Sequence, residues 1–171
     1  METNMVRDTI ELNSRKIQNL RASARFEIMA LRDEVPFQDK FLVDAPDKVF
    51  EYFKQAIKGK SGFKQDIENF IVLFVNSRRR VIGHEIVSHG TLDMLLVHPR
   101  EVFKAAIVMN AQAIIVMHNH PSGDSAPSEA DIRVTRDLIR AGQLLKIEVL
   151  DHVIVGDNNK TSLKEMGYFY A

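Results

Sequence analysis

The chain has 171 residues, of which 23 are basic and 23 acidic, so its formal net charge is zero. It contains no cysteine, which excludes disulfides, thiol catalysis and the zinc-dependent nucleobase deaminases that require a P-C-x-x-C element. The neutral charge does not support general nucleic-acid binding, and the sequence holds neither a signal peptide nor an apolar run long enough to span a membrane. We therefore expect a cytoplasmic protein without a membrane partner.

The chain is predicted to divide near residue 43. Residues 1–43 are expected to form an N-terminal extension, partly strand or helix, that is flexible or docks onto a partner. A strand is predicted within it at 25–32. Residues 44–171 are predicted to form the folded domain.

Apolar periodicity and turn residues predict the elements of this domain. Helices are expected over 44–57, capped by Asp44, and then over 99–110, 128–141 and 161–167. Gly142 is predicted to stop the third of these helices. Strands are expected over 69–75, 81–87, 113–117 and 149–155, with 92–97 a further short strand or an irregular segment. Because helices and strands alternate only in part and a hairpin intervenes, the order predicts an α+β sandwich around a mixed sheet.

The most informative residues follow the apolar run 113–117. His118 and His120 stand at the exit of this predicted strand, and the two-residue period of a strand aims both rings to the same side. Two imidazoles and one carboxylate would leave a tetrahedral zinc ion one open position for water, which is typical of catalytic zinc sites. The alternative is a pair of polar loop residues.

The carboxylate is expected from the start of the helix at 128–141. Ser128 and Asp131 also match a capping box. We expect Ser128 to cap the helix while its hydroxyl faces the metal water or a developing oxyanion, and Asp131 to serve as a ligand rather than as a cap. Asp124 is the rival carboxylate, but its position after Ser-Gly fits a tight turn better.

A hydrolase also needs a base that takes a proton from the attacking water. The candidates are Glu68, immediately before the strand at 69–75, Glu85 in the hairpin partner, and Glu129 beside Ser128. Spacing alone leaves the choice between Glu68 and Glu85 open. His152 is expected to form a buried hydrogen-bonded pair with Asp151, and the alternative is that it orients a ligand ring.

These residues resemble a known family. Glu68, His118-x-His120 and Ser128-x-x-Asp131 are similar to the JAMM signature of the JAB/MPN+ metalloproteases. The stretches 97–103, 118–124 and 150–156 resemble, more closely, the RadC branch of bacterial JAB proteins, and the resemblance covers roughly residues 44–169. It implies the JAB/MPN fold, a cytidine-deaminase-like mixed sheet flanked by helices.

The resemblance also implies roles and a reaction. His118, His120 and Asp131 would hold Zn²⁺, Glu68 would be the general base, and Ser128 would stabilise the oxyanion. The function implied is a zinc-dependent hydrolase whose activated water attacks a peptide or isopeptide carbonyl, with a peptide or protein as substrate.

Full-length RadC proteins carry an N-terminal helix-hairpin-helix module, which is not recognised here. We therefore expect a short form of the kind found on mobile elements and phages. The alternative function is a DNA-repair or DNA-processing accessory of mobile elements with a metal-bound JAB fold and a DNA or DNA-repair partner. The sequence does not decide the oligomeric state.

Overall fold

The computed structural model describes residues 41–90 and 97–169. The predicted strand at 25–32 and most of the segment 92–97 lie outside these residues. The described chain forms a five-stranded mixed sheet in the order β2-β1-β3-β4-β5. Its strands are β1 (Asn69–Val75), β2 (Val81–His89), β3 (Ala113–Asn119), β4 (Glu148–Val155) and β5 (Lys160–Ser162). β3 pairs with β4 in parallel, and the other three pairings are antiparallel.

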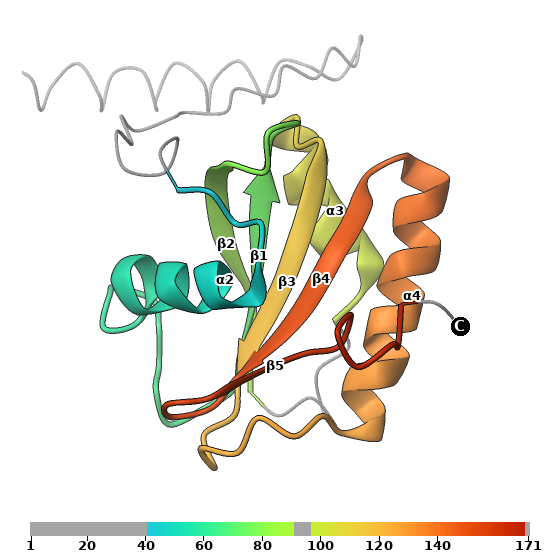
Figure 1. Ribbon diagram of the computed structural model, residues 1–171. Coiled ribbons are helices and arrows are strands. Elements are labelled where there is room, and N and C mark those ends of the chain that lie inside the picture. Colours follow the sequence, from blue (N-terminus) through green and yellow to red (C-terminus); the bar gives the residue numbers. More distant parts are fainter. Residues whose placement is uncertain (1–40, 91–96, 170–171) are drawn as a thin grey trace, which may run out of the picture. The chain divides into compact units, whose positions relative to one another are not determined.

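Helices cover both faces of this sheet (Figure 1). On one face lies α2 (Pro46–Tyr52), which continues as a π-helical turn, Phe53–Ile57. On the other face lie α3 (Pro99–Val108) and α4 (Glu129–Leu145). The predicted α+β fold, a mixed sheet flanked by helices, is therefore confirmed.

Strict alternation along the central strands builds two cores. In β1, Ile71, Leu73 and Val75 pack toward α2, whereas the intervening residues pack toward α3 and α4. β3 follows the same rule, so both strands are buried on both faces and read as continuous apolar runs. Ile114 and Val116 of β3 face the α3 and α4 side, and His118 therefore points toward α4 as well.

Three sequence predictions of local structure are wrong. Ala45, not Asp44, is the N-cap of α2, and it makes no side-chain cap. The segment 161–167 is not a helix but the end of β5 followed by turns. Gly142 does not stop α4, which continues to Leu145 and ends at Lys146 in the left-handed conformation.

Gly142 has a packing role instead. It is buried inside α4, where a Cβ would lie 2.5 Å from the carbonyl oxygen of Ile147 and 3.2 Å from the Phe103 ring. The glycine therefore allows α4 to lie against α3 and the chain that enters β4.

None of the helices in 41–90 and 97–169 is long and apolar enough to cross a membrane.

Candidate metal centre

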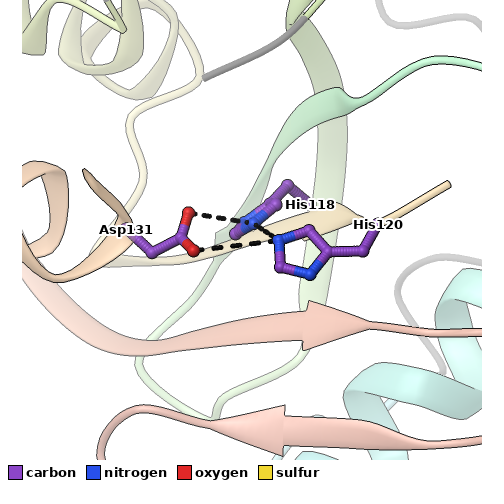
Figure 2. A group of neighbouring side chains, drawn as sticks. All are labelled: His118, His120 and Asp131. Carbon is purple, nitrogen blue, oxygen red and sulfur yellow. Dashed lines mark hydrogen bonds and ion pairs between the residues drawn. The ribbon is translucent and has the colours of Figure 1, made fainter. Parts of the chain in front are cut away.

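Two imidazoles meet at the end of β3. β3 runs two residues further than predicted, so His118 lies within the strand and is completely buried, while His120 follows it and is partly exposed. Their Nε2 atoms lie 2.9 Å apart. Both rings point to the same side (Figure 2), as the two-residue period predicted.

Asp131 completes the group from the first turn of α4. Its Oδ1 lies 3.1 Å from His118 Nε2, and its Oδ2 lies 3.7 Å from His120 Nε2 (Figure 2). One ligand atom from each of the three residues lies within 4.8 Å of the others. The sequence prediction brought together His118, His120 and Asp131, and the structure places them as one cluster.

Asp131 is also a member of a capping box. Its Oδ2 accepts hydrogen bonds from the backbone N–H and from the hydroxyl of Ser128, both at 2.7 Å, while Ser128 Oγ accepts from the Asp131 N–H. The expectation that Asp131 would be a ligand rather than a cap is therefore wrong in one respect. Oδ2 caps the helix, and Oδ1 is left to face the histidines.

The donor set fits a metal ion on two observations. Asp131 Oδ1 is fully buried and has no hydrogen-bond partner in the described part of the chain, and such an oxygen costs about 1–3 kcal/mol unless a cation or donor meets it. His120 Nδ1 lies 2.7 Å from the carbonyl oxygen of Asp124, which only accepts, so Nδ1 carries the hydrogen of the neutral ring. The lone pair of His120 Nε2 then faces the cluster.

The surroundings of Asp131 keep its carboxylate negatively charged. Burial would raise the pKa of Asp131, but the nearby His118 and the hydrogen bonds from Ser128 outweigh it and hold this pKa below its ordinary value. Asp131 is therefore ionised at neutral pH. An ionised carboxylate and two imidazoles are the ligand types that Zn²⁺ prefers when cysteine is absent.

The remaining nitrogen of His118 has a partner in the neighbouring strand. His118 Nδ1 lies 2.8 Å from Nε2 of His152 in β4, and His152 Nδ1 lies 2.6 Å from the Thr135 hydroxyl in α4. Burial, assisted by the proximity of His118, holds the pKa of His152 well below its ordinary value. Asp151 Oδ1 accepts a buried hydrogen bond from the backbone N–H of His152, so the two residues form the predicted pair through the backbone. The His152 ring meets the ring of His118, which is the contact that the alternative predicted.

Glu68 immediately precedes β1. Phe70 pairs with His118 at the end of the β1–β3 ladder, and an extension of this antiparallel register by two residues would set Glu68 opposite His120. The carbonyl oxygen of Glu68 accepts a hydrogen bond from the Gly90 N–H.

Asn119, the residue between the two histidines, holds the segment around Glu68. Its Oδ1 accepts from the Asn69 N–H at 2.9 Å and its Nδ2 donates to the Ile67 carbonyl at 2.9 Å. It thus bonds both neighbours of Glu68. Sequence reasoning assigned no role to Asn119 or Thr135, although Thr135 lies one helical turn after Asp131, which is a usable signal.

The other acidic candidates lie elsewhere. Glu85 is exposed on β2 and pairs with Val72, a full strand away from β3. Glu129 is exposed on the first turn of α4. Asp124 turns its carboxylate onto the Ala126 N–H, and it contributes only its carbonyl to His120.

The comparisons with known proteins agree with this geometry. A model of the RadC-like JAB domain matches residues 43–168. A UPF0758 protein of Finegoldia magna is 45% identical over 131 residues, which are 77% of this chain and 56% of that relative. A UPF0758 protein of Staphylococcus haemolyticus is 45% identical over 149 residues, 85% of this chain and 62% of the relative. The chain thus spans between half and two thirds of the length of these relatives.

Proposed function

This chain belongs to the RadC-like JAB domain family, and on that premise we propose that it is a zinc-dependent hydrolase that cleaves a peptide or isopeptide bond. The observation that carries the proposal is the convergence of His118, His120 and the buried Oδ1 of Asp131, which accepts no hydrogen bond from the described residues. When bound there, Zn²⁺ would polarise a substrate carbonyl and acidify the attacking water.

Glu68 is the proposed general base. Its carboxylate takes the proton from the attacking water and delivers it to the leaving amine, and positioned acid–base catalysis of this kind is worth about 10²- to 10⁴-fold in rate. The register supports Glu68 over Glu85, because extending the β1–β3 pairing by two residues would set Glu68 opposite His120, whereas Glu85 pairs with Val72 on β2. So does the bonding of both its neighbours to Asn119, because a base must be held in place to act.

Ser128 is the proposed oxyanion donor. Its residue is exposed at the N-cap of α4, beside the carboxylate of Asp131, so a substrate can reach it. The hydroxyl hydrogen points to Asp131 Oδ2 in this structure. It must rotate toward the substrate oxygen as negative charge develops there, which leaves Oδ2 with the bond from the Ser128 N–H.

The test compares Glu68→Gln with Glu85→Gln, which removes the rival carboxylate by the same isosteric change. Zinc content is measured by elemental analysis, and turnover on fluorogenic peptides and on isopeptide-linked protein conjugates. We expect equal zinc in both variants, with turnover lowered by about 10²- to 10⁴-fold in Glu68→Gln alone. A wild-type protein that binds no zinc, or a Glu68→Gln variant of full activity, would contradict the proposal.

A DNA-directed function is distinguished by a gel shift with duplex DNA over a range of salt concentrations. The zero net charge of the chain gives it little electrostatic attraction for a phosphate backbone. We expect no salt-dependent binding. Tight binding with a steep salt slope would favour the DNA-processing alternative over the hydrolase.

A further inference from the structure

A row of three hydrogen bonds links the cluster of His118, His120 and Asp131 to the backbone of α4. Thr135 Oγ1 lies 2.6 Å from the carbonyl oxygen of Asp131, His152 Nδ1 lies 2.6 Å from Thr135 Oγ1, and His118 Nδ1 lies 2.8 Å from His152 Nε2. All of the side chains in this row are buried to within 1%. The row therefore exchanges no hydrogen bonds with solvent.

The direction of every bond in this row follows from its first member. A carbonyl oxygen only accepts, so the single hydrogen of the Thr135 hydroxyl goes to Asp131. The Thr135 oxygen must then accept from His152, which places the hydrogen of that neutral ring on Nδ1. His152 Nε2 is consequently an acceptor, and His118 Nδ1 donates to it.

These bond directions determine which nitrogen of His118 faces the cluster of His118, His120 and Asp131. With its hydrogen on Nδ1, the neutral His118 ring carries a lone pair on Nε2, the atom that lies 2.9 Å from His120 Nε2 and 3.1 Å from Asp131 Oδ1. Given the ligands proposed above, we propose that Thr135 and His152 are positioning residues that fix His118 in the metal-binding tautomer before any ion arrives. Without this row, the ring could place its hydrogen on Nε2 and direct it at Asp131.

Packing holds both rings at the angles that the row requires. The Phe70 ring stacks on His118, with centroids 6.1 Å apart and planes at 14°, and meets His152 edge-on at 5.6 Å. Asp131 and Thr135 are one helical turn apart on α4 and are both fully buried. One face of one helix therefore supplies a ligand and the anchor that orients another ligand.

The first experiment reads the tautomers directly. Long-range ¹H–¹⁵N spectra of the metal-free wild-type protein at neutral pH report which nitrogen of each histidine carries hydrogen. We expect Nδ1–H for both His118 and His152. A His118 ring that carries hydrogen on Nε2 and none on Nδ1 in this sample would overturn the proposal, whatever the protein binds.

The second experiment measures zinc affinity by competition with a chromogenic chelator. Thr135→Val keeps the shape of the side chain but removes the acceptor for His152, and we expect zinc binding to weaken by about 10- to 100-fold. Thr135→Ser restores the hydroxyl and should restore both the affinity and the His118 Nδ1–H signal. His152→Gln keeps an acceptor for His118 and should lose less affinity than His152→Leu.

The matched control is Tyr52→Phe. It removes a buried hydroxyl that lies 2.8 Å from another histidine, His84, on the opposite face of the sheet. Zinc affinity should stay at the wild-type value. Equal affinity in wild type, Thr135→Val and Thr135→Ser would overturn the positioning role. Failure of the wild type itself to bind zinc would instead remove the proposed function, while the expected tautomers would still support the proposal.

Discussion

Gly142→Ala separates helix propensity from packing, because the two predict opposite signs. In an exposed helix interior, alanine is more stable than glycine by about 1 kcal/mol. At position 142 the new Cβ would lie 2.5 Å from the Ile147 carbonyl oxygen, 3.2 Å from the Phe103 ring and 3.3 Å from a methyl group of Val149. The nearest atom belongs to the backbone and cannot rotate away, so the cost lies near the upper end of the 1–3 kcal/mol typical of overpacking.

The net expectation for Gly142→Ala is a loss of about 2 kcal/mol in the free energy of unfolding, which lowers the melting temperature by roughly 4–8 °C for a domain of this size. Urea unfolding followed by circular dichroism measures the first quantity and a thermal scan the second. The control is the pair Gln143→Gly and Gln143→Ala at the next, exposed position, where alanine should be the more stable. If Gly142→Ala raised the free energy of unfolding by as much as alanine exceeds glycine at position 143, the close approach of α4 to the Ile147 carbonyl would be refuted.

Three further changes test the site and its surroundings. Asn119→Ala removes the bonds to Asn69 and Ile67, so we expect lower turnover at unchanged zinc content. If turnover fell no more than in an unrelated variant of equal stability, Asn119 would not be needed to hold Glu68 in place. Ser128→Ala should lower turnover by about 10²- to 10³-fold and stability by about 1 kcal/mol, measured by kinetics and urea unfolding; an effect on stability alone would leave Ser128 only as a cap. Burial raises the pKa of Asp151 above its ordinary value, despite hydrogen bonds from Ser162 and from the backbone N–H groups of Lys164 and His152. The folded state then binds this proton more tightly than the unfolded state does, so its contribution to stability is full below the unfolded pKa and is lost as the pH rises through the folded pKa. The unfolding free energy of the metal-free wild type, taken relative to Asp151→Asn, should therefore fall with rising pH in that window, and a rise would show the sign to be wrong.

The central strands could be predicted from the sequence because the polarity of each residue in them matches the burial of its own position. The run Phe70 to Val75 is apolar at every position, as a strand covered on both faces requires. The two-residue period then placed His118 and His120 on one side without any knowledge of the partner strands. Local periodicity was sufficient for both conclusions.

What could not be predicted depends on approach between distant segments. Glycine after a helical run is ordinarily a stop signal, but at Gly142 the deciding neighbours are Phe103 and Val149, which only the packed fold brings close. The bond between His118 and His152 likewise joins β3 to β4 across the parallel register. No spacing rule within either segment indicates which ring nitrogen meets which.

The two roles of Asp131 were expected to compete, and the geometry explains why they do not. A carboxylate has two oxygens, and the first turn of a helix needs only one of them to accept from the Ser128 N–H and hydroxyl. Those bonds fix the side-chain rotamer, and the fixed rotamer turns the second oxygen into the buried space beside His118. The capping bonds therefore also orient Asp131 Oδ1, the proposed ligand atom. A capping box whose acidic member is fully buried, as Asp131 is, differs from an ordinary surface cap, because solvent cannot satisfy the oxygen that the helix leaves over. That remaining acceptor, next to two imidazoles, is the physical reason why this place in the fold could bind a cation.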